Sequence, residues 1–159
     1  MRTRIILVAN LIGVLAVSYA LLAQSQESLW GTWHLNLAKA KYDPPVPPPK
    51  SNAKKYEPWQ GGVKATQDVV TATGEKRHME VTGKFDGKDN PVVGQSDNDS
   101  YAFKKIDDHT YEVTGKKGGK VAQVSKIVVA ADGKTRVVTQ SGTNAKGEAF
   151  HNVLLWDKH

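Results

Sequence analysis

Apolar and polar residues alternate along short segments of this chain. The clearest case begins at Gly31, in the run GTWHLNL, where Trp33, Leu35 and Leu37 alternate with polar residues. A two-residue period is typical of a β-strand with one buried face. Gly31 lets the chain turn into the strand, and Trp33 supplies its largest apolar side chain. We expect the strand to run over 31–39 and the rest of the chain to pack around it.

The alternation returns in further segments, most of which end at a turn signal such as Gly-Gly or Asp-Gly. These pairs favour hairpins because they accept positive φ, and such short connections make neighbouring strands antiparallel. The stretch from Asp86 through Pro91 to Asp99 is expected to be a loop. The predicted strands after the first are 51–57, 63–71, 76–84, 100–106, 110–116, 121–130, 135–141 and 148–157.

A meander of about 8–10 short strands has two ways to protect its edges: closure into an up-and-down barrel, or folding into a sandwich. The even hairpin rhythm favours an all-β, antiparallel up-and-down barrel. A barrel embedded in a membrane is disfavoured, because the positions opposite the apolar ones hold Lys, Glu and Thr.

The first 23 residues read as a secretory signal peptide, followed by a single domain over 24–159. Arg2 and Arg4 precede an uncharged apolar run over 5–22, and small residues offer cleavage sites after it. The run is long for a signal, so a retained membrane anchor is the alternative. We favour cleavage, with export to the bacterial periplasm or outside the cell and no stable membrane insertion afterwards.

The composition narrows the function classes. The chain has 159 residues and no cysteine, which rules out disulfides, Cys-ligated metals and thiol catalysis. Of its 22 basic residues two lie in the signal segment, leaving 20 against 16 acidic residues, or +4. The charges alternate in sign along the chain, which indicates a solubilising surface and no nucleic-acid partner.

Five of the seven prolines lie between Pro44 and Pro49. Proline has no amide hydrogen for a strand ladder, so this segment is predicted to be an extended loop. It is interpreted as a stiff crossing over the end of a barrel, with a ligand for a partner's aromatic groove as the alternative.

The Gly31-Thr32-Trp33 strand resembles the first strand of the lipocalins and fatty-acid-binding proteins, which form the calycin superfamily. The closing run LLWDK over 154–158 is similar to the last strand of the fatty-acid-binding branch, and small secreted bacterial lipocalin-like proteins are similar throughout. The resemblance implies a calycin-like barrel, closed at one end by Gly31 and Trp33, which holds a small ligand in its lumen. The lipocalin Thr-Asp-x-x-Tyr motif is absent.

Arginine is rare after the signal segment, with Arg77 and Arg136 beside 18 lysines. Three interpretations stay open. Either arginine could be exposed at a strand end, could stack on Trp33 at the barrel floor, or could clamp an anionic ligand with Tyr101 or Tyr111 as a hydroxyl partner.

Gln67 and Gln123 fall on predicted core faces, where a polar side chain needs a partner such as a wet cavity. The candidate ligand-binding residues are therefore Arg77, Arg136, Tyr101, Tyr111, Phe103, Gln67 and Gln123. The histidines lack zinc-ligand spacing and the acidic loop lacks calcium-ligand spacing, so no metal and no cofactor are expected. No nucleophile elbow or phosphate loop occurs, so we do not expect an enzyme.

These observations predict an exported, monomeric binding protein that holds a small, mostly apolar or amphipathic molecule in the lumen. The alternative is an envelope protein–protein interaction module with a filled barrel or sandwich and no small-molecule ligand. A barrel enzyme of unknown reaction is a third hypothesis.

Overall fold

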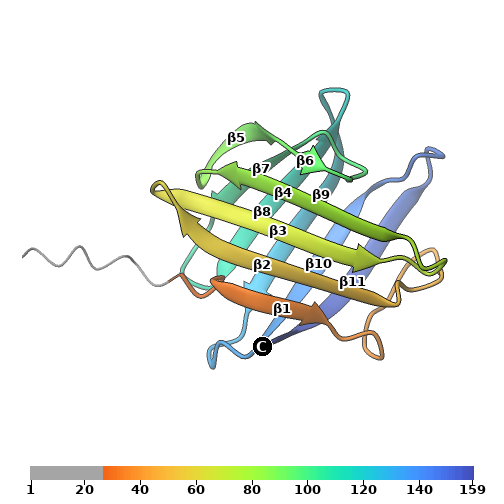
Figure 1. Cartoon of the computed structure of the whole chain (residues 1–159), viewed down its shortest axis with the longest axis horizontal. Helices are drawn as coiled ribbons and strands as arrows, with labels where there is room; N and C mark the ends of the chain where they lie inside the picture. The colour runs from red at the N-terminus through yellow and green to blue at the C-terminus, as the bar shows by residue number, and fades with distance from the viewer. Residues whose placement is uncertain (1–26) are drawn as a thin grey trace, which may run out of the picture.

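The computed structural model describes residues 27–159, and in that range the chain forms eleven strands and no helix (Figure 1). The predicted signal peptide and the first residues of the predicted domain lie outside the described residues. No helix able to cross a lipid bilayer occurs in the described part of the chain. The strands are β1 (Gly31–Leu35), β2 (Ser51–Trp59), β3 (Gly62–Val70), β4 (Lys76–Gly83), β5 (Asp86–Pro91), β6 (Val93–Gly94), β7 (Ser100–Lys105), β8 (Thr110–Lys117), β9 (Lys120–Val129), β10 (Thr135–Thr143) and β11 (Ala149–Lys158).

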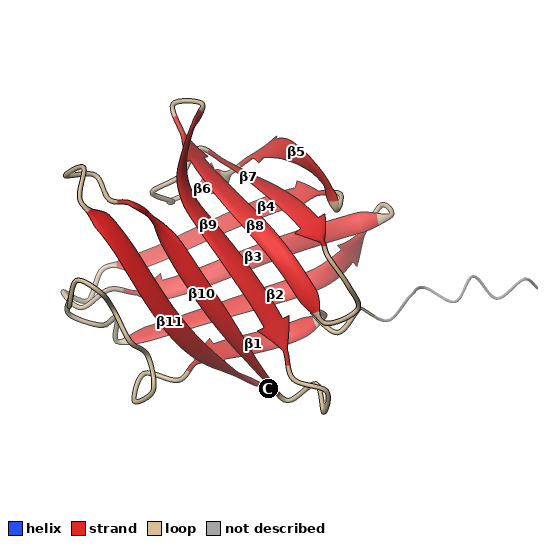
Figure 2. Ribbon diagram, turned by 180° about the vertical axis from the view of Figure 1, so that it is seen from behind, coloured by secondary structure: helices blue, strands red, loops and turns tan. Residues whose placement is uncertain are grey.

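All strands belong to one antiparallel sheet in the order β5-β7-β8-β9-β10-β11-β1-β2-β3-β4-β6. Consecutive strands pair from β1 to β4 and from β7 to β11, whereas β5 pairs with β7 and β6 pairs with β4. β1 joins the two halves by pairing with both β2 and β11. Figures 1 and 2 show β1–β4 and β8–β11 as two walls that face each other. The outermost strands of the order, β5 and β6, follow one another in the chain, so the sheet forms a nearly closed barrel. The predicted antiparallel all-β barrel is confirmed.

Nine strands lie where alternation predicts them, and the two short strands β5 and β6 occupy the stretch predicted to be a loop. β5 is polar and almost wholly exposed, and it pairs with β7 through its backbone. The first strand is shorter than predicted: it ends at Leu35, whereas the prediction extended it to residue 39. Leu37 is 39% exposed and faces away from the core.

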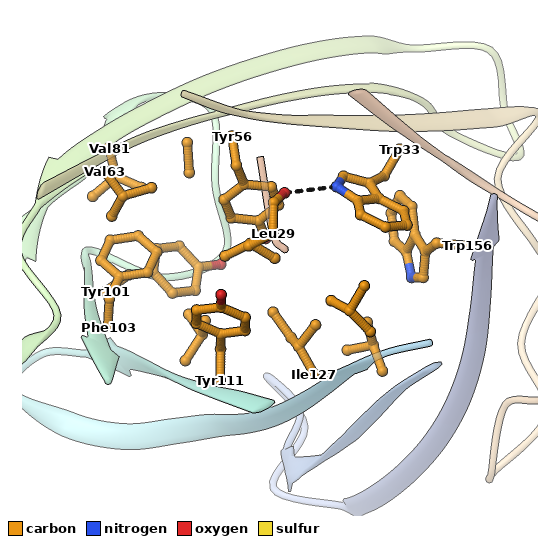
Figure 3. Close-up of a cluster of buried hydrophobic side chains, with 14 of the residues drawn as sticks. Leu29, Trp33, Tyr56, Val63, Val81, Tyr101, Phe103, Tyr111, Ile127 and Trp156 are labelled. Atoms are coloured by element: carbon orange, nitrogen blue, oxygen red, sulfur yellow. Dashed lines mark hydrogen bonds between the residues drawn. The ribbon is translucent and has the colours of Figure 1, made fainter. Parts of the chain in front are cut away.

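The barrel core is richest in aromatic side chains around Trp33, which is fully buried. Figure 3 shows Leu29 in the middle of this group, with Trp33 and Trp156 on one side and Tyr101 and Phe103 on the other. The indole Nε1 of Trp33 donates to the backbone carbonyl of Leu29 at 2.9 Å. Leu29 lies outside any strand yet is 0% exposed, so the segment before β1 belongs to the core.

Residues 27–30 form a plug at one end of the barrel. Tyr111 at the start of β8 donates to Glu27 Oε2 at 2.8 Å, and the Nζ atom of Lys105 at the end of β7 lies 2.9 Å from the same oxygen. The hydrogen bond to Glu27 raises the pKa of Lys105, despite a smaller opposing effect of burial. The plug and the aromatic core therefore close this end, and any opening into the lumen must lie at the other.

Gly31 connects the plug to β1. Its φ is 122°, which L side chains rarely adopt, and a Cβ there would come within 2.6 Å of the Lys158 Cε atom. The backbone conformation therefore favours glycine at position 31, two residues before Trp33, whereas the end of the Lys158 side chain could move aside.

Candidate functional site

The lumen is unfilled at the end opposite the plug, where a cavity of about 340 Å³ opens. Strands from both walls of the barrel line this cavity with inward-facing residues that lie toward the end opposite the plug. Its floor includes Met79, Leu154 and Trp156. Its lining includes these polar residues: Asn52, Lys54, Gln67, Thr71, Arg77, Gln95, Ser96, Asp97, Asn98, Tyr101, Gln123 and Gln140.

Carboxamide side chains from both walls of the barrel line this cavity. Gln67 on β3 donates to Asn52 Oδ1 at 2.9 Å. Gln123 on β9 and Gln140 on β10 both donate to the hydroxyl of buried Ser125, at 2.8 and 3.4 Å. A carboxamide carries two N–H donors and one acceptor oxygen, so each can make further hydrogen bonds to a ligand. The alternation of strand residues places these groups inward, above the apolar core.

Lys54 is a partly buried cation on the inward face of β2. It lies opposite Gln67 in the β2–β3 register, and its Nζ atom is 5.9 Å from the ring centroid of Trp156. Within residues 27–159 it makes no hydrogen bond or ion pair. The lumen therefore contains an ammonium group whose contact is an aromatic ring.

Arg77 lies at the rim of the same cavity. Its Nε and Nη2 atoms donate to the two carboxylate oxygens of Glu75, each at 3.1 Å, and Nη1 lies 3.5 Å from Asp97. The hydrogen bond and charge of Glu75 raise the pKa of Arg77. The Arg77 guanidinium is thus already paired, with a side chain that is 38% exposed.

A second, larger cavity of about 780 Å³ adjoins the first, and we call it the vestibule. The two share Tyr42, Ser96, Asp97, Asn98 and Gln123. The vestibule lies between the Pro-rich loop and the hairpin ends of β8–β11, and the residues lining it include the apolar Val46, Val121 and Phe150. Pro47 and Pro49 line the inner cavity. The Pro-rich segment therefore passes over the open end of the barrel.

Arg136 lies at the closed end, away from the cavity, and is 1% exposed. Its Cζ atom lies over the rings of Trp33, Trp156 and Tyr56, at 4.8, 4.9 and 5.0 Å from their centroids. None of its guanidinium nitrogens has a hydrogen-bond partner in the described part of the chain. Burial lowers the pKa of Arg136, and the neighbouring Tyr56 offsets this in part. Among the interpretations left open by the sequence, the geometry matches stacking on Trp33.

The structure brings four of the seven sequence-predicted ligand residues together, since Arg77, Tyr101, Gln67 and Gln123 all line the cavity. Arg136, Tyr111 and Phe103 do not line it, because they are packed into the aromatic core beneath.

Sequence reasoning missed Lys54 and Gln140 as lumen residues. Two signals pointed to them: Lys54 is two residues before the aromatic Tyr56, and Gln140 is two residues after Val138. Applied to these two positions, alternation would have placed each on a core face.

No cluster of three or more His, Asp or Glu side chains suited to a metal ion occurs within 27–159. His78 is on the outer surface, where its Nδ1 atom lies 2.7 Å from Asp68. The hydrogen bond to Asp68 raises the pKa of His78. The His78–Asp68 pair lies on the exposed face of β3 and β4 and does not line the lumen.

Comparison of the chain with models of known protein families gives no match, and neither does comparison with curated proteins. The nearly closed antiparallel barrel is consistent with a calycin-like fold. A barrel of this shape is compatible with ligand binding, so function has to be argued from the lumen itself.

Proposed function

We propose that the protein is an exported, lipocalin-like binding protein that holds one small amphipathic molecule in its lumen. The observation that carries the proposal is the division of the barrel along its axis. One end is closed by the plug and the aromatic core, and the other holds a 340 Å³ cavity that continues into the vestibule. Pockets of a few hundred Å³ with a few convergent polar groups are the usual sites for small ligands.

The lining bears on the kind of ligand. The inner cavity is bounded mainly by amides, hydroxyls and charged groups, whereas the vestibule presents Val46, Val121 and Phe150. Polar groups in a lumen are satisfied by a ligand that offers donors and acceptors, and apolar walls are satisfied by an alkyl or ring portion. An amphipathic molecule, with its polar end inside, fits this lining better than a wholly apolar one.

The proposal is tested with an uncharged fluorescent probe, N-phenyl-1-naphthylamine, titrated into the wild-type protein. Gln123 lines both cavities, so Gln123→Trp should obstruct their junction. The matched control is Lys126→Trp, which adds the same ring to the exposed face of the same strand. We expect saturable binding by the wild type and by Lys126→Trp, and a dissociation constant raised about tenfold or more in Gln123→Trp.

Unchanged binding in a folded Gln123→Trp variant would show that the probe sits elsewhere and would contradict the proposal. Absence of binding to the wild type would also contradict it. Circular dichroism of each variant establishes that the barrel is folded.

The second candidate is an interaction module without a small ligand. It is favoured by an apolar row on the outer face of β9–β11, where Val128 and Val137 are paired neighbours and 43% and 39% exposed. Exposed apolar residues that adjoin one another are a feature of protein contact surfaces. The probe titration separates the candidates, because this module needs no open lumen.

A further inference from the structure

The inward-facing charges of the barrel are unbalanced. Lys54 and Arg136 both lie over the ring of Trp156, at 5.9 and 4.9 Å from its centroid, and neither has a carboxylate partner within residues 27–159. The carboxylate that lines the cavity, Asp97, is 93% exposed at the rim, where it is 3.5 Å from Arg77. The deep part of the lumen therefore has positive charge and no resident anion.

Hydrogen-bond donors are also in excess there. The indole Nε1 of Trp156 is buried without an acceptor in the described part of the chain, as are the nitrogens of Arg136. Removing cations from water is unfavourable unless an anion or strong acceptor replaces the lost solvation, and aromatic faces replace only part of it. The region is therefore electrostatically suited to an anion.

Tyr56 responds to this charge. Burial on its own raises a tyrosine pKa, yet the pKa of Tyr56 is lowered, because the nearby charges of Lys54 and Arg136 outweigh the effect of burial. The positive potential therefore extends into the fully buried layer beneath the cavity.

In its lack of an ion pair Lys54 differs from several lysines outside the lumen, although others, such as Lys126, also have no ion pair within residues 27–159. Lys55, its neighbour on the outward face, lies 2.8 Å from Glu57. Lys64 and Lys116 are likewise paired with Glu80 and Asp89, at 2.9 and 2.7 Å. The inward lysine lacks a counter-ion where several outward lysines have one.

We propose that Lys54 binds the anionic end of the ligand and that the ligand is an amphipathic molecule with a single carboxylate. This inference rests on the proposed lumen function and specifies its ligand class. The ammonium group supplies a charge-assisted hydrogen bond, and Gln67, opposite it in the register, supplies an amide beside the carboxylate. The apolar part of the molecule then extends through the cavity toward Val121 and Phe150 in the vestibule.

Arg136 and Arg77 are less suited than Lys54 to bind the anionic end of the ligand. Arg136 is covered by Trp33, Tyr56 and Trp156 and does not line the cavity, so it contributes through its field alone. The Arg77 guanidinium is already bound to Glu75 through two hydrogen bonds. Of the two cations that line the inner cavity within residues 27–159, Lys54 and Arg77, only Lys54 has no ion pair.

The test compares decanoate with decanol, which have the same chain length and differ in charge, by displacement of N-phenyl-1-naphthylamine from the wild type and three variants. Lys54→Met removes the charge and keeps the side-chain stem. Lys54→Arg keeps a charge, and Lys55→Met removes the adjacent outward charge as the matched control. We expect the wild type to favour decanoate over decanol about tenfold or more, as a charge-assisted bond in a partly buried site would give.

That preference should disappear in Lys54→Met and persist in Lys54→Arg and Lys55→Met. Decanol binding that is retained in Lys54→Met, with a circular dichroism spectrum matching the wild type, shows that this variant is folded with an accessible lumen. Equal affinity of the wild type for both ligands, or an undiminished preference in Lys54→Met, would overturn the anion inference and leave the proposed function standing. Failure of both ligands and of the probe to bind would overturn the proposed function itself.

Discussion

Arg136 is surrounded by aromatic rings, whereas a buried cation is usually paired with a carboxylate. The faces of Trp33, Tyr56 and Trp156 each attract a cation, by about 0.5–2 kcal/mol per ring. Against this stands the cost of removing an unpaired guanidinium from water, several kcal/mol even after relaxation. The two contributions are similar in size, so we infer that Arg136 stabilises the closed end through the volume it fills more than through its charge.

Two substitutions at this position separate charge from volume. Arg136→Met keeps most of the volume and should change the free energy of unfolding by less than about 1.5 kcal/mol. Arg136→Ala opens a cavity among the three rings and should cost about 2–5 kcal/mol. Urea denaturation of both variants checks the difference. Equal destabilisation by Met and Ala would show that the charge itself holds the rings together.

At single positions, the sequence predicted inward residues well where a polar side chain interrupts an apolar alternation, as at Gln67 and Gln123. It failed at Lys54, because a lysine in a strand is nearly always exposed and its neighbour Lys55 fits the same description. Alternation with Tyr56 favours an inward Lys54 over an inward Lys55, and the burial of Tyr56 establishes it.

Hairpin strands are the elements that the sequence predicted best, because period-two alternation and Gly-containing turns are both local signals. β5 lacks them, because its pairing with β7 relies on backbone groups that any residue carries. The plug could not be predicted either, since residues 27–30 are too few to show a period. Its role depends on Tyr111 and Lys105, which are about eighty residues further along the chain.

The plug gives a prediction at this scale. Leu29→Ala removes a side chain that is 0% exposed at the closed end and should cost about 2–5 kcal/mol of unfolding free energy. Leu37→Ala, at a site that is 39% exposed just beyond β1, is the matched control and should cost less than about 0.5 kcal/mol. Urea denaturation measures both. Similar small losses would mean that the plug adds little to the barrel.

Across the whole molecule, the interior changes character along the barrel axis. On β2 the inward residues pass from Asn52 and Lys54 to Tyr56, and on β10 they pass from Gln140 to Val138. Composition and periodicity predicted a barrel with some polar inward positions, but they could not show that these positions gather at one end. That gathering depends on the register of strands distant in sequence, and it creates the cavity on which the proposed function rests. Export and a monomeric state stay predictions.

Native mass spectrometry tests the central claim most directly. The protein, purified gently and incubated with a lipid extract of its host, would be measured beside Gln123→Trp and Lys126→Trp. We predict one small-molecule adduct per chain in the wild type and in Lys126→Trp, lost on denaturation and absent or strongly reduced in Gln123→Trp. A wild-type protein that stays free of adducts, or an adduct that Gln123→Trp retains in full, would contradict it.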